Sequence, residues 1–339
     1  MQQRYKEVSN SVRWCFTINP DRLGPVTLRD TWLAALVALI WGLNFLVIDW
    51  GLTDMPPLLL VALRFVAVAV PAVFLVPRPA APWRVVVAVG VFTSLGQFAL
   101  LYLGLQAGMP PGLAALLLQA QVVLTVVIAA GALRERPRPA QVAGVLLGSG
   151  GLAVVAVGRG GDVTLTALLL VLGAALSWAV GNVVTRSAGV GSGLGLTVWS
   201  ALVVPAPVLA LSLVTDGPTV VGAALAGISW QAVVSTLYTA GLASLVGYGI
   251  FSTLLGRYRS ATVVPWVLLV PVVAMSAAWL LLDQRPNAAE AGGGLLLVLG
   301  ALVATRAGQR PGPADGTGSR LRWRRRRTGP RPRPAPATR

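Results

Sequence analysis

Two residues able to bind a charged solute, Asn44 and Arg64, each lie inside a long apolar stretch of this 339-residue chain. An arginine at the centre of a membrane helix costs about 2.5 to 3.5 kcal/mol on insertion scales, so it has to face protein or water. Arg64 lies about eight residues into its stretch, roughly 12 Å deep. One interpretation is packing, with the guanidinium bonded to backbone carbonyls. The other is a cation in a cavity that binds a substrate carboxylate through two hydrogen bonds.

A tryptophan and an asparagine occur together twice in the chain. Trp41 and Asn44 are three residues apart, and Trp178 and Asn182 are four apart, so each pair shares a helix face. An indole and an amide facing one cavity suit a small polar solute. The alternative is that the asparagines join neighbouring helices by hydrogen bonds, as polar groups do in membranes.

Two glutamines and two prolines lie at related places further along. Gln119 and Gln121 point about 200° apart on a regular helix, so one face presents only one of them. We expect one to face the cavity and the other to bond a neighbouring helix. Pro265 and Pro271 flank Trp266 and should bend or break their helix, which is typical of transporter substrate sites.

The residue types that are missing exclude several kinds of chemistry. The chain has no histidine and a single cysteine, Cys15, which excludes His-ligated metals, Ser-His-Asp triads and disulfide frameworks. The acids Asp49, Asp283 and Glu290 lie near the ends of apolar stretches, and none lies at mid-depth. We therefore expect no catalytic residue, no metal and no cofactor, and we find no obvious proton carrier.

The elements that position these residues are membrane helices. The chain is 55% hydrophobic and 11% charged, with a mean hydropathy of +0.75, whereas soluble domains carry about 25% charged residues. A spanning helix needs about 20 apolar residues. This predicts an all-α integral membrane protein with ten transmembrane helices at 31–50, 56–77, 84–104, 111–132, 139–158, 164–186, 194–214, 229–252, 260–282 and 288–306.

Basic residues predict the orientation. Of the 27 Lys and Arg residues, 24 fall on the side that holds both termini, and only Arg159 and Arg285 fall on the other. Both termini should therefore be cytoplasmic. Because the net charge of +16 is distributed in this way, it is an orientation signal, and we expect no nucleic-acid partner.

The two halves resemble each other. Residues 133–155 align with 282–304 at a constant offset of 149, and "LIWGLNF" is echoed by "LSWAVGN". Because each half has five spans, an odd number, the second half has the opposite orientation in the membrane to the first. We therefore predict two inverted five-helix repeats, 30–158 and 164–306, with a substrate site between them near the midplane.

Two segments lie outside the repeats. Residues 1–29 form a cytoplasmic extension without a signal-peptide core, and we hypothesise that translation begins near Val26. Residues 307–339 are rich in Arg and Pro and predict a disordered cytoplasmic tail. The tail either reinforces orientation or contacts anionic lipid headgroups.

The ordered motifs "WGLNF", "MPPLLLVALRF", "GMPPGLAALLLQAQ", "SWAVGN", "VWSAL", "VGYGIFSTLLGRY", "LLVPVV" and "LLLDQRP" resemble the drug/metabolite transporter superfamily. They are most similar to its EamA-type exporters, in particular the bacterial exporters of O-acetylserine and cysteine, over residues 30–306. The sequence departs from that pattern at Gln284, where we expect Glu, and at Trp266, where a smaller residue is usual.

The resemblance implies an exporter of small amino-acid-like metabolites in the bacterial inner membrane, working by alternating access. Its partners would be a small-molecule substrate and membrane lipids, with a homodimer as a further possibility. The alternatives are export of other amino acids or drugs, or a non-transporting scaffold. The substrate-binding residues that we predict are Trp41, Asn44, Arg64, Gln119, Trp178, Asn182, Tyr248 and Trp266.

Overall fold

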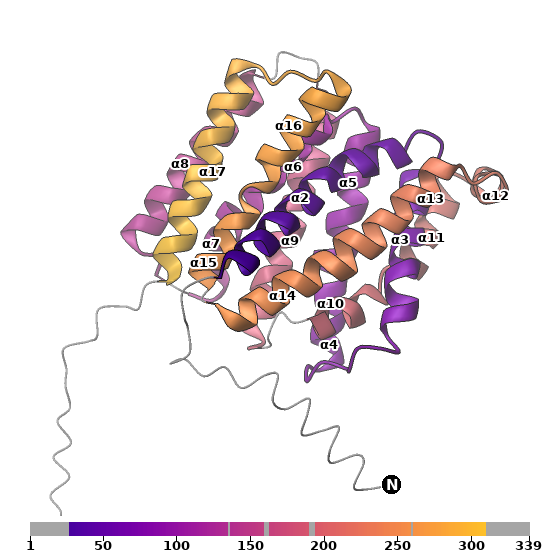
Figure 1. Cartoon of the computed structure of the whole chain (residues 1–339), viewed down its shortest axis with the longest axis horizontal. Coiled ribbons are helices and arrows are strands. Elements are labelled where there is room, and N and C mark those ends of the chain that lie inside the picture. Colours follow the sequence, from indigo (N-terminus) through magenta and orange to yellow (C-terminus); the bar gives the residue numbers. More distant parts are fainter. Residues whose placement is uncertain (1–26, 135, 159–162, 190–193, 259, 310–339) are drawn as a thin grey trace, which may run out of the picture. The chain divides into compact units, whose positions relative to one another are not determined.

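A computed structural model describes residues 27–134, 136–158, 163–189, 194–258 and 260–309 of the chain (Figure 1). These residues form helices joined by short turns, and none of them lies in a strand. Most of the predicted N-terminal extension, including Val26, and residues 310–339 of the predicted tail lie outside the described residues. The first helix begins at Leu28 and the last ends at Gln309, so both helices reach slightly beyond the predicted repeat boundaries.

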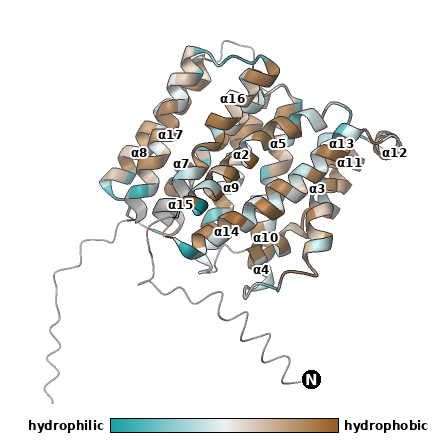
Figure 2. Ribbon diagram, in the orientation of Figure 1, coloured by the Kyte–Doolittle hydropathy of each residue, from teal (hydrophilic) through white to brown (hydrophobic). Residues whose placement is uncertain are grey.

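Ten helical segments of the described part are long and apolar enough to cross a membrane, which confirms the predicted number. Figure 2 shows that hydrophobic residues dominate these segments along most of their length. The helices are α2 (Leu28–Gly51), α3 (Pro57–Ala72), α4 (Trp83–Val89), η2 (Gly90–Gly96), α5 (Gln97–Gln106), α6 (Pro111–Leu118), α7 (Ala120–Ala132), α8 (Pro139–Gly158), α9 (Leu165–Ser187), α10 (Leu194–Ala201), α11 (Pro205–Thr215), α12 (Pro218–Ala226), α13 (Trp230–Leu237), η3 (Tyr238–Gly247), α14 (Tyr248–Arg257), α15 (Ser260–Val267), α16 (Val270–Leu282) and α17 (Ala288–Gln309).

The fourth span of each repeat is interrupted at the same place. In the second repeat the break between α15 and α16 falls at Leu268 and Leu269, as the flanking prolines predict. In the first repeat α6 and α7 are separated by Gln119 without a proline at the break. Tighter bonds from residue i+3 to residue i replace the regular ladder there, such as Gln119 N to Leu116 O at 3.0 Å. Interrupted helices leave backbone and side-chain polar groups available near the centre of the membrane.

The third span of each repeat contains a π-helix, η2 in the first repeat and η3 in the second. Each π-helix receives a side-chain hydrogen bond from the first helix of the opposite repeat. Trp41 Nε1 on α2 donates to the Ala243 carbonyl at 2.9 Å, and Ser177 Oγ on α9 donates to the Phe92 carbonyl at 2.7 Å. These bonds satisfy backbone carbonyls of the π-helices. The π-helix is a rare element that is found frequently at functional sites.

The first helix of each repeat therefore packs against helices of the opposite repeat, and we call these two helices the exchanged first helices. Helix α2 packs on η3, α14 and α16 of the second repeat, and α9 packs on η2, α5 and α7 of the first. Gly247 permits the contact of α2 with η3, because a Cβ at this position would lie 2.5 Å from Trp41 Nε1. The fifth spans, α8 and α17, lie side by side (Figure 1), and glycines on both let their backbones touch.

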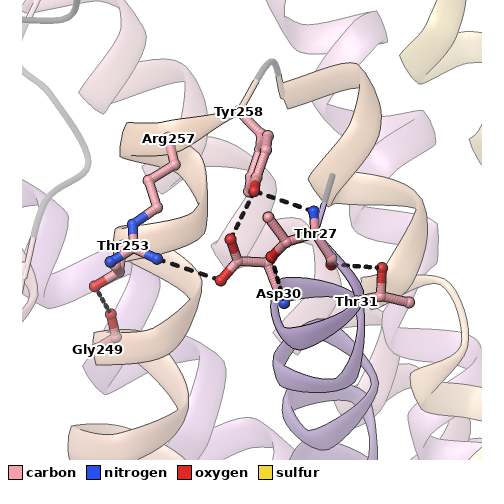
Figure 3. A network of polar contacts seen from close by, with 7 residues as sticks. All are labelled: Thr27, Asp30, Thr31, Gly249, Thr253, Arg257 and Tyr258. Atoms are coloured by element: carbon pink, nitrogen blue, oxygen red, sulfur yellow. Dashed lines mark hydrogen bonds and ion pairs between the residues drawn. The ribbon is translucent and has the colours of Figure 1, made fainter. Parts of the chain in front are cut away.

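A polar network at one end of the bundle holds α2 against α14 (Figure 3). Tyr258 Oη donates to Asp30 Oδ2 at 2.6 Å, and Arg257 Nη1 forms an ion pair with Asp30 Oδ1 at 3.3 Å. Thr27 Oγ1 caps α2 by accepting from the Asp30 backbone N–H at 3.2 Å. The network ties the first helix of one repeat to the third span of the other at the end where the chain enters the bundle.

Candidate substrate-binding site

A cavity lies between the repeats and consists of two adjoining chambers. The entrance chamber has a volume of about 450 Å³ and the inner chamber about 300 Å³. The entrance chamber reaches Arg186, at the end of α9, and Leu196, at the start of α10, so it opens at the end of the bundle that carries residues 27 and 309. The residues that line both chambers are Arg64, Gln97, Phe98, Trp178, Asn182, Tyr248 and Phe251.

Arg64 is the charged group shared by the two chambers, and only 2% of its surface is exposed. Nη1 donates to the Tyr102 hydroxyl at 3.3 Å and Nη2 donates to Ser244 Oγ at 3.2 Å. The guanidinium carbon lies 4.1 Å from the centre of the Phe98 ring. Within the described part of the chain, Nε has no hydrogen-bond partner and no carboxylate pairs with the side chain. The cation is thus held in place by neutral groups and keeps an uncompensated charge and a free donor.

Asn44 and Gln119 place two further unpaired atoms at the inner chamber. Asn44 is 7% exposed and Gln119 is 4% exposed, and both line this chamber. Neither Asn44 Oδ1 nor Gln119 Oε1 has a hydrogen-bond partner among the described residues. Buried polar atoms are normally satisfied, and leaving one without a partner costs about 1 to 3 kcal/mol. Two residues of one chamber therefore each carry a buried amide oxygen that the described residues leave without a partner.

Gln121 bonds the neighbouring helix α9, as we expected for one of the two glutamines, but the expectation that only one of them reaches the cavity is wrong. Both line the inner chamber, because the helix is interrupted at Gln119 and the regular 100° rotation per residue does not apply across the break. Gln121 Oε1 accepts from Asn182 Nδ2 at 2.9 Å, and Asn182 also reaches Thr125 Oγ1 at 3.4 Å. Asn182 therefore joins α9 to α7, as the helix-joining interpretation expects, and it also lines the cavity.

Aromatic side chains form much of the wall. Trp41 contacts Tyr248 with ring centres 4.9 Å apart and Phe251 with ring centres 5.3 Å apart. Trp41 lines the inner chamber, while Trp178 and Tyr248 line both chambers. Such faces pack against an apolar substrate side chain and attract an ammonium group.

Trp266 is placed elsewhere. It packs beside Ala34, Leu254 and Val263 in a separate apolar cluster and does not line either chamber. The adjacent Val267 reaches the inner chamber instead. Because α15 ends at Val267, just before the break, the proline-flanked segment presents that neighbour to the cavity. Trp266, which we predicted to bind substrate, therefore lies outside both chambers.

Sequence reasoning missed several residues of the cavity. Gln97 lines both chambers and is 4% exposed, and it is the one glutamine inside the apolar stretch 84–104, a signal that could have found it. Ser94 in η2 and Ser244 in η3 line the entrance chamber. Serine is common in membrane helices for packing, so the sequence carries no signal for either residue.

Acidic residues do not line either chamber among the residues described. In the same part of the chain, no group of three or more His, Cys, Asp or Glu residues could hold a metal ion. The cavity thus combines one buried cation, unpaired amide oxygens and aromatic walls. It can neutralise an anionic group, accept hydrogen bonds and pack against apolar atoms.

Comparisons with known proteins identify relatives along almost the whole membrane portion. The EamA-like transporter family matches residues 30–157 and 165–306. The chain is 41% identical to a probable amino-acid metabolite efflux pump of Escherichia coli over 281 residues, which are 81% of this chain and 94% of that protein. It is 29% identical to a probable terminal-alkyne amino-acid exporter of Streptantibioticus cattleyicolor, over 81% of this chain and 90% of that one.

The fold has also been seen in solved structures. One crystal structure, with 24% sequence identity, matches 83% of this chain and 97% of its own chain with a TM-score of 0.54. At this identity the likeness concerns the fold alone.

Proposed function

Since this chain belongs to the EamA-like transporter family, we propose that it exports small amino-acid-like metabolites, with O-acetylserine, cysteine or their relatives as substrates. We place it in the bacterial inner membrane with both termini in the cytoplasm, following the bias of basic residues. The named relatives, a probable amino-acid metabolite efflux pump and a probable terminal-alkyne amino-acid exporter, support this substrate class.

The observation that carries the proposal is the state of Arg64. A cation that is 2% exposed and lacks a carboxylate partner in the described residues is costly, and a substrate carboxylate would both neutralise it and occupy the free Nε donor. Tyr102 and Ser244 hold the guanidinium from two different spans, so the donor is already oriented. An orienting contact of this kind favours binding over a packing role for Arg64.

The arrangement of the repeats supports alternating access as the mechanism that we propose. The cavity lies between the group formed by α2, η3, α14 and α16 and the group formed by α9, η2, α5 and α7. Rocking one group against the other would close the entrance chamber and open the opposite side. The entrance chamber opens toward the end that we assign to the cytoplasm, which is where an exporter loads its substrate.

The test is efflux of labelled O-acetylserine and cysteine from proteoliposomes with and without a pH gradient. We expect saturable flux in the wild type and a loss of about a hundredfold in Arg64→Leu, because a charge-assisted bidentate contact is removed. Arg84→Gln is the matched control, since Arg84 is exposed at the start of α4. Absence of flux for both solutes in the wild type would contradict the substrate assignment, and a wider screen of amino acids and drugs would replace it. Equal flux in wild type and Arg64→Leu would assign Arg64 to packing.

A further inference from the structure

We infer that the inner chamber contains a subsite for the protonated amino group of the substrate, formed by Asn44 Oδ1 and Gln119 Oε1. The inference rests on the proposed function and narrows it: the substrate class is the α-amino acid with a free ammonium group. Carboxylates whose amino group is acylated, and amines without a carboxylate, are rejected.

Unpaired polar atoms are concentrated in the residues of the inner chamber. Six buried polar side-chain atoms of the described residues lack a hydrogen-bond partner, and three of them belong to residues of the inner chamber, namely Asn44 Oδ1, Gln119 Oε1 and Arg64 Nε. Two are acceptors and one is a donor. A zwitterion supplies the complement, with an ammonium that donates and a carboxylate that accepts.

The two acceptors belong to different elements of the fold. Asn44 lies on α2, and Gln119 lies at the break between α6 and α7. Helix α2 packs directly on α6, so the two residues line the chamber from adjacent elements. Arg64 comes from α3 and is anchored toward α5 and η3 through Tyr102 and Ser244. Acceptors and cation therefore belong to different parts of the wall, as the two ends of a zwitterion require.

The charge of the inner chamber also favours a zwitterion. The inner chamber has no acidic residue among those described and contains the Arg64 cation. An amine without its own carboxylate would be repelled by the guanidinium in this low-dielectric site. An ammonium attached to a carboxylate brings the compensating charge with it. The rings of Trp41 and Tyr248, whose centres lie 4.9 Å apart, line this chamber. They would add a cation–π attraction for the ammonium group.

A sodium ion is a poorer occupant of the two oxygens. Hard cations bind through several oxygen ligands that usually include carboxylates, whereas the described part of this chamber offers neutral amides and a nearby positive charge. An ammonium needs only two or three acceptors, and its remaining proton can meet an aromatic face.

The experiment compares three solutes in proteoliposomes: O-acetylserine, its isomer N-acetylserine, and O-acetylethanolamine. The isomers share the carboxylate and the acetyl group but differ in the ammonium, and the third solute lacks only the carboxylate. We expect wild-type flux of O-acetylserine to exceed that of the other two by at least about tenfold, the size expected for a lost hydrogen bond to a charged group.

The variants Asn44→Leu and Gln119→Leu should lower O-acetylserine flux about tenfold and reduce the preference over N-acetylserine to less than about threefold. Gln106→Leu is the matched control, because Gln106 is exposed at the end of α5 and lines neither chamber, so its preference ratio should stay within about twofold of wild type. Sodium removal should leave the ratio unchanged.

Equal wild-type flux of the two isomers would overturn the ammonium subsite while leaving the proposed exporter intact. An unchanged preference ratio in both leucine variants would overturn the assignment of Asn44 and Gln119. If the preference for O-acetylserine disappeared without sodium, the occupant of the two oxygens would be a metal cation and not the ammonium group. Absence of flux for all three solutes would overturn the proposed function and the subsite together. The comparison of isomers in the wild type needs no variant to fold.

Discussion

Gln119 and Leu268 occupy equivalent positions at the interruption of the fourth span in the two repeats, separated by the same offset of 149 residues that aligns 133–155 with 282–304. Both are 4% exposed. The first is an amide with an unpaired oxygen at the cavity, and the second is an aliphatic side chain of the apolar interior. The interruption itself is thus common to both repeats, whereas the hydrogen-bonding group is found in one.

The first helices differ in the same way. Asn44 on α2 has an unpaired oxygen, while Asn182 on α9 donates to Gln121 and Thr125. The broken helices, the π-helices and the exchanged first helices occur in both repeats, which is what a motion between two inverted halves needs. The unpaired polar atoms of the chamber all come from the first repeat. The inverted repeat thus duplicates the scaffold, whereas the unpaired polar groups of the chamber are asymmetric.

Among the tests of this asymmetry between the repeats, the largest effect is expected from substituting the two residues at the breaks. Gln119→Leu should lower amino-acid flux about tenfold, because the ligand loses an acceptor. Leu268→Gln should lower the free energy of unfolding by about 1 to 3 kcal/mol, because it buries an amide without a partner, and it should not raise flux. Transport assays and thermal unfolding in detergent measure the two quantities. Equal loss of flux in both variants would show that the repeats contribute symmetrically.

A smaller effect is expected at the contacts between first helices and π-helices. Gly247→Ala places a Cβ 2.5 Å from Trp41 Nε1, and Gly96→Ala places one 2.3 Å from Ser177 Oγ. Each should destabilise the fold by about 1 to 3 kcal/mol through overpacking. Only Gly247→Ala should also change the O-acetylserine preference ratio, because Trp41 lines the inner chamber.

Gly249→Ala is the control for these two variants, since nothing lies within 4 Å of its added Cβ. Its melting temperature and preference ratio should match those of the wild type. A changed ratio in Gly96→Ala would show that the first-repeat π-helix also shapes the binding site, and would weaken the asymmetry.

The smallest effect is expected at the end of the bundle, where Asp30 joins α2 to α14. Asp30→Asn removes the ion pair with Arg257, whose side chain is 56% exposed, and keeps an oxygen that accepts from Tyr258. The Asp30 side chain is only 5% exposed, but the Arg257 end of the pair is exposed and the contact with Tyr258 is kept, so the loss should be about 1 kcal/mol and the melting temperature should fall by at most about 2 °C. Flux should be unchanged. A large loss of flux would mean that this end of the second repeat takes part in gating.

The sequence predicted the fold well because each span is a long apolar run that ends at Gly, Pro or charged residues. The break at Gln119 was not predictable, since no proline lies in the break and only the tertiary packing stabilises the tight turn. That single difference determined whether Gln119 and Gln121 share the cavity. Seven of the eight predicted site residues line the cavity, because an amide, a guanidinium or an aromatic pair inside an apolar run is costly elsewhere. Trp266 carried no such cost, and the structure places it in an apolar cluster.

The central claim is that Arg64 binds a substrate carboxylate, and direct binding tests it without relying on transport. Purified wild-type protein in detergent is titrated with cysteine and with cysteamine, which lacks only the carboxylate, beside Arg64→Gln and the control Arg84→Gln. We expect wild type and Arg84→Gln to bind cysteine at least about tenfold more tightly than cysteamine, and we expect Arg64→Gln to lose this difference. Binding of cysteine and cysteamine with equal affinity in the wild type, or an unchanged difference in Arg64→Gln, would contradict it.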